Sequence, residues 1–381
     1  MKTKFILFLS LFLLFNCIQK ISVEKVPVIP LNFEAAKAYF TLVEKIQKGG
    51  IISEKEWSSF FNIEGNKLFI EDLRLSEEDI SMLKKTIRVA YQPKVDTIAA
   101  NKLALKSFRL LSRIRYKKNH QLYKDYLAKI ERIQITFVDS IIAQTKAFLP
   151  KDLMIYRAMP TIYYHALNSD GDATANNRIF MSVLASYERN SNRIGNVEAH
   201  ELHHNFRPDL SYYKTHADSA YYRTEIEAAD RIVYNALMLA LNEGLADMVD
   251  KDLLLADTSK WWRKDTIQAL YMREGENVVK KLNEYLAAAA NGANQDLELY
   301  QTLYSSYNGH IPGYFMAKAI KDNGRLGEII EHAGNPFIFF LTYQEVALNN
   351  DKLPAFDDVV IDYLEQLNIK YMEKLETKWE G

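Results

Sequence analysis

The sequence has no excess of charge of either sign, because 48 Lys and Arg residues balance 49 Asp and Glu residues over 381 positions. Without a basic surplus, the chain lacks the electrostatic signature that nucleic-acid-binding proteins share. Glycine and proline are scarce, at 14 and 9 residues, which argues against a disordered chain or a turn-rich all-β fold. A hydrophobic content of 48% is ample for a packed core. The composition therefore predicts a mostly helical globular protein with one large domain or two smaller ones.

Cysteine is almost absent, and the one cysteine, Cys17, follows an apolar run from Phe5 to Phe15. A single cysteine cannot form a disulfide bond within the chain. The basic residues Lys2 and Lys4 precede the apolar run. The run is too short to cross a bilayer but has the length of the hydrophobic region of a secretory signal. We therefore expect a signal peptide over residues 1–16 and disfavour a retained membrane helix.

The residues before Cys17 resemble the lipobox of bacterial lipoproteins, in which cleavage exposes a cysteine that carries lipid. Leu14 fits this motif, whereas Asn16 departs from it because a small residue normally precedes the cysteine. The alternative is an ordinary signal peptide with an incidental cysteine. The resemblance implies a lipid anchor at Cys17 and a tether over residues 17–30. It also implies a bacterial membrane lipoprotein outside the cytoplasm, in the periplasm or on the cell surface.

Helical periodicity begins after this tether and continues to position 150. Ser76 is expected to cap a helix, because acidic residues occupy the first turn that follows it. None of the segments up to position 150 carries a cluster of metal-ligand or nucleophile residues, so residues 31–150 are predicted to form a helical N-terminal region. Further helices are expected at Phe33–Ile46, Glu54–Phe61, about Val95–Tyr116 and about His120–Ala147.

The pattern changes between Pro150 and Glu188, where segments rich in Ile, Tyr, Phe and Val flank a polar cluster at Asn168–Asn177. Such segments are typical of short strands. After Asn192 the chain is helical again, almost to its end. We therefore predict a predominantly helical α+β fold, with a second domain over residues 151–381 that contains a small antiparallel sheet. Its strands are expected at Asp152–Arg157, Thr161–His165 and Arg178–Ser186.

Two histidines four positions apart, His200 and His204, enclose Glu201 in an H-E-x-x-H pattern. On a helix, residues four apart share a face, so both imidazoles can reach one zinc ion. Glu201 can then take a proton from the attacking water. The three-histidine arrangement of metzincins is excluded, because Arg207 and Leu210 occupy positions that require Gly and His.

A catalytic zinc ion needs a third protein ligand, and Glu243 is the preferred candidate. Asp247 lies four residues later on the same face of a predicted helix, where a second carboxylate can orient a ligand imidazole. Glu225 and Glu227 are alternatives that lie nearer in the sequence. They rank lower because neither has a carboxylate partner one helical turn later.

The Asn-Glu-x-x-x-Asp pattern that follows H-E-x-x-H resembles thermolysin and its relatives, the gluzincins. This resemblance implies that Glu243 is the third zinc ligand and that Asp247 hydrogen-bonds His200. It further implies that Glu201 is the general base and that residues 151–381 form a gluzincin-like catalytic domain. Glu198, two positions before the first histidine, departs from the pattern and is expected to face solvent or to contact a cation.

Gluzincins also provide a hydrogen-bond donor to the oxyanion of the tetrahedral intermediate. Two glycines and a proline between Ser306 and Ala317 are expected to force a turn, after which an apolar helix begins at Tyr314. This segment resembles the one that supplies the donor tyrosine in aminopeptidase-type gluzincins. By that resemblance His310 stands at the tyrosine's position, with Tyr307 and Tyr314 as alternatives. A helix-capping turn with purely structural aromatic residues is an equally good interpretation.

The resemblance covers roughly residues 150–325 and implies a strand beside the cleft that pairs with an extended substrate, expected at Arg178–Leu184. The Gly-x-Met-Glu-Asn segment of aminopeptidases is absent. The chain is also similar to bacterial lipoproteins described as zinc-dependent peptidases. We therefore expect a zinc-dependent metallopeptidase that cleaves peptides or proteins with a metal- and glutamate-activated water. The alternatives are a zinc amidase acting on non-protein amides such as cell-wall peptides, or a surface-binding lipoprotein without enzymatic activity.

Overall fold

The computed structural model contains an α+β protein in which helices predominate, as predicted. The predicted signal peptide, Cys17 and the tether as far as residue 27 lie outside the described residues, and so does most of the strand expected at Asp152–Arg157. The structure describes residues 28–93, 109–151, 153, 158–174, 176–190, 193–206, 226–256, 267–293, 296–305 and 308–373.

The helices of the first half follow the periodicity and capping residues of the sequence. Ser53 and Ser76 each form a capping box, in which the serine side chain accepts a hydrogen bond from a backbone N–H of the first turn. The helix expected at His120–Ala147 is two helices, which meet at Ile133. The helices are α2 (Glu34–Gln47), α3 (Glu54–Phe61), α4 (Glu64–Asp72), α5 (Glu77–Tyr91), α7 (Arg109–Lys118), α8 (His120–Arg132) and α9 (Gln134–Lys146).

The sheet is mixed and not purely antiparallel, which corrects the prediction. Its strands are β1 (Leu31–Asn32), β2 (Thr161–His165), β3 (Gly171–Thr174) and β4 (Arg178–Ser182), in the order β1-β2-β4-β3. The chain reverses direction before and after β3, so β2 and β4 run parallel and β3 runs antiparallel at the outer edge. β4 is shorter than predicted because the Ser182 side chain caps the short helix α10 (Val183–Arg189).

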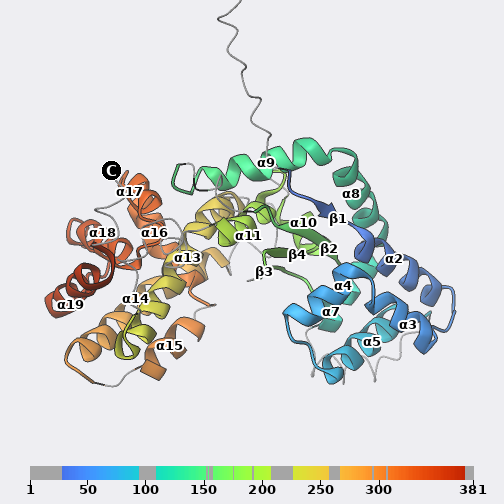
Figure 1. Cartoon of the computed structure of the whole chain (residues 1–381), viewed down its shortest axis with the longest axis horizontal. Coiled ribbons are helices and arrows are strands. Elements are labelled where there is room, and N and C mark those ends of the chain that lie inside the picture. Colours follow the sequence, from blue (N-terminus) through green and yellow to red (C-terminus); the bar gives the residue numbers. More distant parts are fainter. Residues whose placement is uncertain are drawn as a thin grey trace, which may run out of the picture.

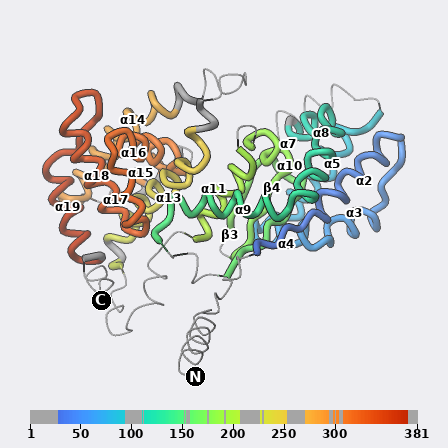
Figure 2. Tube along the Cα trace, turned by 90° about the horizontal axis from the view of Figure 1, so that it is seen from above, coloured from blue at the N-terminus to red at the C-terminus, as the bar shows by residue number. Residues whose placement is uncertain are grey.

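The described residues pack around two separate hydrophobic cores. The first lobe, Ile29–Phe206, contains the sheet and the helices up to α11 (Asn196–Phe206), and its core also includes Val249 from later in the chain. The second lobe, Ile226–Tyr371, is helical. The first core draws on residues from both sides of position 150, and the domain boundaries expected from the sequence stay a prediction. Figures 1 and 2 show the lobes side by side along the longest axis, with α11 and α13 (Ala228–Ala256) between them.

The second lobe is built around α13, which packs against α11 and four helices of its own lobe. By length and composition, the segment Asp230–Asp252 could cross a membrane, but 78% of its apolar window is buried inside the protein. α13 is therefore the core helix of this lobe. The other helices are α14 (Ile267–Ala290), α15 (Asp296–Ser305), α16 (His310–Asp322), α17 (Leu326–Glu331), α18 (Pro336–Leu348) and α19 (Asp358–Asn368), followed by a π-helical turn at Ile369–Glu373.

α13 and α16 cross at backbone contact, and two glycines make this crossing possible. A Cβ atom added to Gly313 would lie 2.1 Å from the carbonyl oxygen of Ala240. A Cβ atom added to Gly244 would lie 2.6 Å from the carbonyl oxygen of Gly313. The sequence predicted a turn that includes both glycines and a helix that begins at Tyr314, and this prediction is wrong. Gly309, with φ of 89°, makes the turn, and α16 begins at His310, so Gly313 is already helical. The crossing brings His310, the first residue of α16, alongside α13.

Candidate metal centre

The two histidines of the H-E-x-x-H pattern lie on one face of α11 and point to one place. The Nε2 atoms of His200 and His204 are 3.2 Å apart, as the four-residue spacing predicts. The His200 residue is only 3% exposed, so its imidazole is held by the surrounding side chains.

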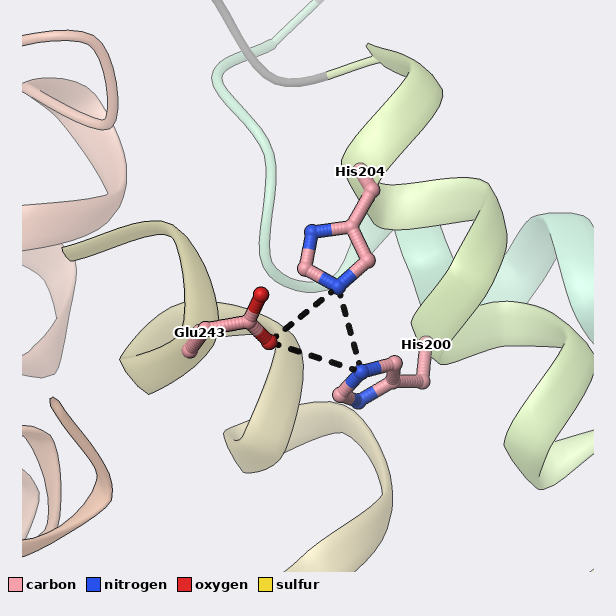
Figure 3. Close-up of side chains that lie close together, drawn as sticks. All are labelled: His200, His204 and Glu243. Atoms are coloured by element: carbon pink, nitrogen blue, oxygen red, sulfur yellow. Dashed lines mark hydrogen bonds and ion pairs between the residues drawn. The ribbon is translucent and has the colours of Figure 1, made fainter. Parts of the chain in front are cut away.

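Glu243 reaches the same place from α13 (Figure 3). Its Oε2 atom lies 3.3 Å from Nε2 of His204 and 3.9 Å from Nε2 of His200. This oxygen is buried and accepts no hydrogen bond of good geometry from the described residues. Burial acts to raise the pKa of Glu243, but His204, His310 and His200 hold it well below its usual range. The carboxylate is therefore ionised, which is the form that binds a metal ion.

These three side chains fit a zinc ion. Ligand atoms about 2.0–2.1 Å from a tetrahedral zinc ion are roughly 3.3 Å from one another, and the observed separations of 3.2–3.9 Å are close to that value. Two imidazole nitrogens and one carboxylate oxygen are also ligands that zinc prefers in catalytic sites. His200, His204 and Glu243 therefore form a candidate site for one metal ion.

The carboxylate that orients His200 is Asp250, not Asp247 as predicted. Nδ1 of His200 hydrogen-bonds Oδ1 of Asp250 at 3.1 Å, whereas Oδ1 of Asp247 is 3.6 Å away. The reason is geometric, because Nδ1 points away from the metal position and faces the part of α13 beyond Asp247. Sequence reasoning missed Asp250, although positions 243, 247 and 250 share one helical face. That spacing is the signal that could have identified it.

Asp247 instead binds His310, the first residue of α16. Its Oδ2 atom lies 3.0 Å from Nδ1 of His310, and Oε2 of Glu243 is 3.3 Å from the same nitrogen. The His310 ring stacks beside that of His200, with centroids 5.9 Å apart. Burial acts to lower the pKa of His310, but Asp247 and Glu243 raise it above its usual value. The structure thus places His310 at the edge of the metal site.

The other predicted residues of this segment are not placed at the metal site. The Tyr314 hydroxyl donates to Oδ1 of Asp252 at 2.9 Å, which occupies it within the second lobe. Tyr307 and the rival ligand Glu225 lie outside the described residues. The carboxylate of Glu227, the second rival, pairs with Lys370 at 3.0 Å.

Glu201 lies buried between α11 and the edge strand β3. A Cβ atom added to Gly171 would lie 2.9 Å from Oε1 of Glu201, so a larger residue at this position would displace the carboxylate. Burial raises the pKa of Glu201 to about 7; His200 opposes this shift, and Asp170 and Asp172 add to it. A carboxylate with this pKa can accept and return a proton near neutral pH.

The strand beside Glu201 is β3, and this corrects the expectation that the segment Arg178–Leu184 flanks the cleft. Among the described strands, β4 lies inside the sheet between β2 and β3, whereas β3 has a neighbour on one side only. The outer edge of Gly171–Thr174 therefore carries the unpaired backbone groups next to the site.

Glu198 is fully buried and does not face solvent, which corrects the prediction. Its carboxylate accepts hydrogen bonds from Tyr164 at 3.0 Å and Asn190 at 2.7 Å, and also from Ser186. No described cation contacts it. On the same helix His203 is buried, and its Nε2 atom bonds the carbonyl oxygen of Phe148. These contacts anchor α11 in the first lobe, so the metal-facing side of the helix is held in place.

Comparison with known proteins supports the assignment of a metal site. Searches of the curated proteins and of the solved structures found no significant match. A family model matches residues 57–352, a range that includes α11, α13 and the start of α16. The family is described as zinc-dependent, in agreement with the histidine and carboxylate groups that could hold a metal. The chain belongs to the family described as "Putative zinc dependent peptidase (DUF5700)".

Proposed function

We propose that this protein is a zinc metallopeptidase of the gluzincin type that hydrolyses peptide bonds. The observation that carries the proposal is the convergence of His200, His204 and the buried Oε2 atom of Glu243, with Glu201 directly after His200 on α11. A structural zinc site has four protein ligands, whereas the set found among the described residues has three, as in a catalytic site with an open position.

The three ligands would hold the ion, and a zinc ion supplies two effects when bound: it lowers the pKa of water and polarises the scissile carbonyl group. Glu201 accepts a proton from the attacking water as the oxygen–carbon bond forms. It returns this proton to the leaving amine as the carbon–nitrogen bond breaks. The buried position of Glu201 suits this role, because the pKa of its carboxyl group lies near neutral pH.

His310 is the proposed donor to the oxyanion that develops on the scissile carbonyl. Nδ1 of His310 donates to the Asp247 carboxylate, and in the imidazolium form, which the raised pKa of His310 favours, Nε2 can also donate a hydrogen bond to the substrate. The edge of β3 is the proposed strand for the substrate backbone, because an extended peptide can pair with a free strand edge. Gly171 at the start of this strand also permits close approach to Glu201.

The test is hydrolysis of a fluorogenic peptide library by the zinc-loaded protein and by Glu201→Gln. The variant should lose turnover by about 10²–10⁴-fold, because general acid–base catalysis contributes this much. Its zinc content should remain normal, since Glu201 does not bind the metal. Loss of zinc together with activity would contradict the assigned role. Turnover of cell-wall peptides without cleavage of any library peptide would move the substrate class to non-protein amides.

We also propose that the mature protein is anchored by lipid at Cys17 on the outer side of a bacterial membrane. The proposal rests on the basic residues Lys2 and Lys4, the apolar run Phe5–Phe15 and the cysteine that follows it. In cells supplied with labelled fatty acid, the wild-type chain should carry label and sediment with membranes. Cys17→Ser should carry none. Equal labelling of the two proteins would exclude an anchor at this residue.

A further inference from the structure

A buried lysine lies between the two carboxylates that orient the histidines of the site. Nζ of Lys251 is 2.9 Å from Oδ2 of Asp250 and 3.2 Å from Oδ1 of Asp247. The side chains of both aspartates are 0% exposed, and that of Lys251 is 12% exposed. Both ion pairs are therefore largely shielded from water. Charges attract each other more strongly in such a buried environment than at a protein surface.

Each of these two carboxylates holds a different histidine. Asp250 binds Nδ1 of His200, which is a candidate metal ligand. Asp247 binds Nδ1 of His310, the proposed oxyanion donor. Lys251 thus completes a continuous chain of contacts in the order His200, Asp250, Lys251, Asp247 and His310. This chain connects residues of α11, α13 and α16, so it spans both lobes.

The charges explain why a lysine is needed here. Two carboxylates buried side by side repel each other, and a buried charge without a partner is strongly destabilising. Burial acts to raise the pKa of Asp250, but Lys251 and His200 hold it well below its usual range. Burial likewise acts to lower the pKa of Lys251, but the two aspartates raise it. The lysine ammonium and the Asp250 carboxylate are therefore charged together.

Lys251 also bears on the number of metal ions. His200, Asp247 and His310 form a second group of side chains close enough to hold an ion. Asp247 already has the Lys251 ammonium 3.2 Å away, so a divalent cation there would be repelled by the lysine. The arrangement favours one metal ion at His200, His204 and Glu243.

We propose that Lys251 is a positioning residue that holds Asp247 and Asp250 in place and so orients the metal ligand His200 and the donor His310 together. The inference rests on the proposed function, because both histidine roles belong to it. The ion pairs described for Lys251 are with these two carboxylates, so it acts on the histidines through them.

The experiment compares Lys251→Met with Lys321→Met as a matched control. Lys321 of α16 pairs with Asp252 of α13, but Asp252 contacts no described histidine. Three quantities are measured: zinc affinity by chelator competition, kcat and KM on a cleaved peptide, and the melting temperature of the metal-free protein. Lys251→Met should weaken zinc binding roughly 10- to 100-fold, as for loss of a group that orients a ligand histidine. It should also lower kcat with little change in KM. The control should leave zinc affinity and kcat unchanged.

The double variant Lys251→Met/Asp247→Asn tests whether removal of one carboxylate relieves the effect of losing Lys251. It removes one positive and one negative charge, so zinc affinity should recover toward the wild-type value while kcat stays low. This variant should also fold if Lys251→Met alone does not. Wild-type zinc affinity and kcat in folded Lys251→Met, or no recovery in the double variant, would overturn the role of Lys251. A wild-type protein that binds no zinc would instead overturn the proposed function itself.

Discussion

The two lobes contribute to the metal site in different ways. The first lobe supplies His200, Glu201 and His204 from one turn of α11, and helical periodicity alone brings them together. The second lobe supplies carboxylates from α13 and His310 from α16, which are brought together by the crossing at Gly244 and Gly313. The first contribution is a local property of sequence, whereas the second depends on tertiary packing. The predictions below separate the two, from the largest expected effect to the smallest.

His310→Ala tests the second lobe's part in catalysis. Loss of an oxyanion donor acts mainly on the transition state, so kcat should fall about 10²–10³-fold with little change in KM and with zinc retained. Tyr314→Phe is the control, because its hydroxyl is bound to Asp252. A histidine that only caps the turn would lower the melting temperature and spare kcat. Normal kcat in His310→Ala together with inactivity of Tyr307→Phe or Tyr314→Phe would identify a tyrosine donor.

Asp250→Asn and Asp247→Asn should have separable effects, because the two carboxylates hold different histidines. Asp250→Asn should weaken zinc affinity about 10- to 100-fold, as its hydrogen bond to His200 is altered. Asp247→Asn should lower kcat more than zinc affinity, since it binds His310. Chelator competition and steady-state kinetics on both variants distinguish these outcomes. A larger loss of zinc affinity in Asp247→Asn than in Asp250→Asn would instead support the prediction from the sequence that Asp247 orients His200.

Gly313→Ala tests whether the helix crossing positions the second lobe's residues. The added methyl group would lie 2.1 Å from the carbonyl oxygen of Ala240, so α16 must shift. We expect a loss of about 1–3 kcal/mol in the free energy of unfolding, which is typical of overpacking. Gly327→Ala in α17 is the control, because nothing lies within 4 Å of its added methyl group. Equal stability of the two variants, measured by urea denaturation, would mean that the crossing is not tight.

The sequence predicted those parts of the structure that depend on local pattern. The helix at Glu54–Phe61, the cap at Ser76 and the strand at Thr161–His165 follow from capping residues and periodicity. Strand order could not be predicted, because the parallel pairing of β1 with β2, which lies far along the chain, depends on non-local contacts. The partner of His200 was also missed, since the choice between Asp247 and Asp250 depends on the angle at which α11 meets α13.

His165, in the core of the first lobe, should make the stability of this lobe depend on pH. Burial lowers its pKa to about 3, and Arg113 adds to the shift, so the folded state keeps the ring neutral. Above about pH 6.5 neither folded nor unfolded chains bind the proton, and this residue has no effect. As the pH falls from 6.5 toward 3, only the unfolded chain binds it, so stability falls.

At pH 5.5 protonation of His165 in the unfolded chain should lower the free energy of unfolding by about 1.4 kcal/mol, because this pH is one unit below the usual histidine pKa. His165→Asn keeps an acceptor for the Leu167 N–H and removes the titrating ring. Denaturation of the metal-free proteins at pH 7.5 and 5.5 should show a smaller acid-induced loss in the variant. Identical pH dependence of the two proteins would show that His165 does not titrate on unfolding.

The most direct test of the central claim is the zinc content of the protein lacking residues 1–17. After dialysis against zinc and then against buffer, we expect about one zinc ion per chain by atomic emission spectroscopy. His200→Ala/His204→Ala/Glu243→Ala should retain almost none while keeping its helical circular dichroism. Stoichiometric zinc in the folded triple variant, or no zinc in the wild-type protein, would contradict a metal site formed by α11 and α13.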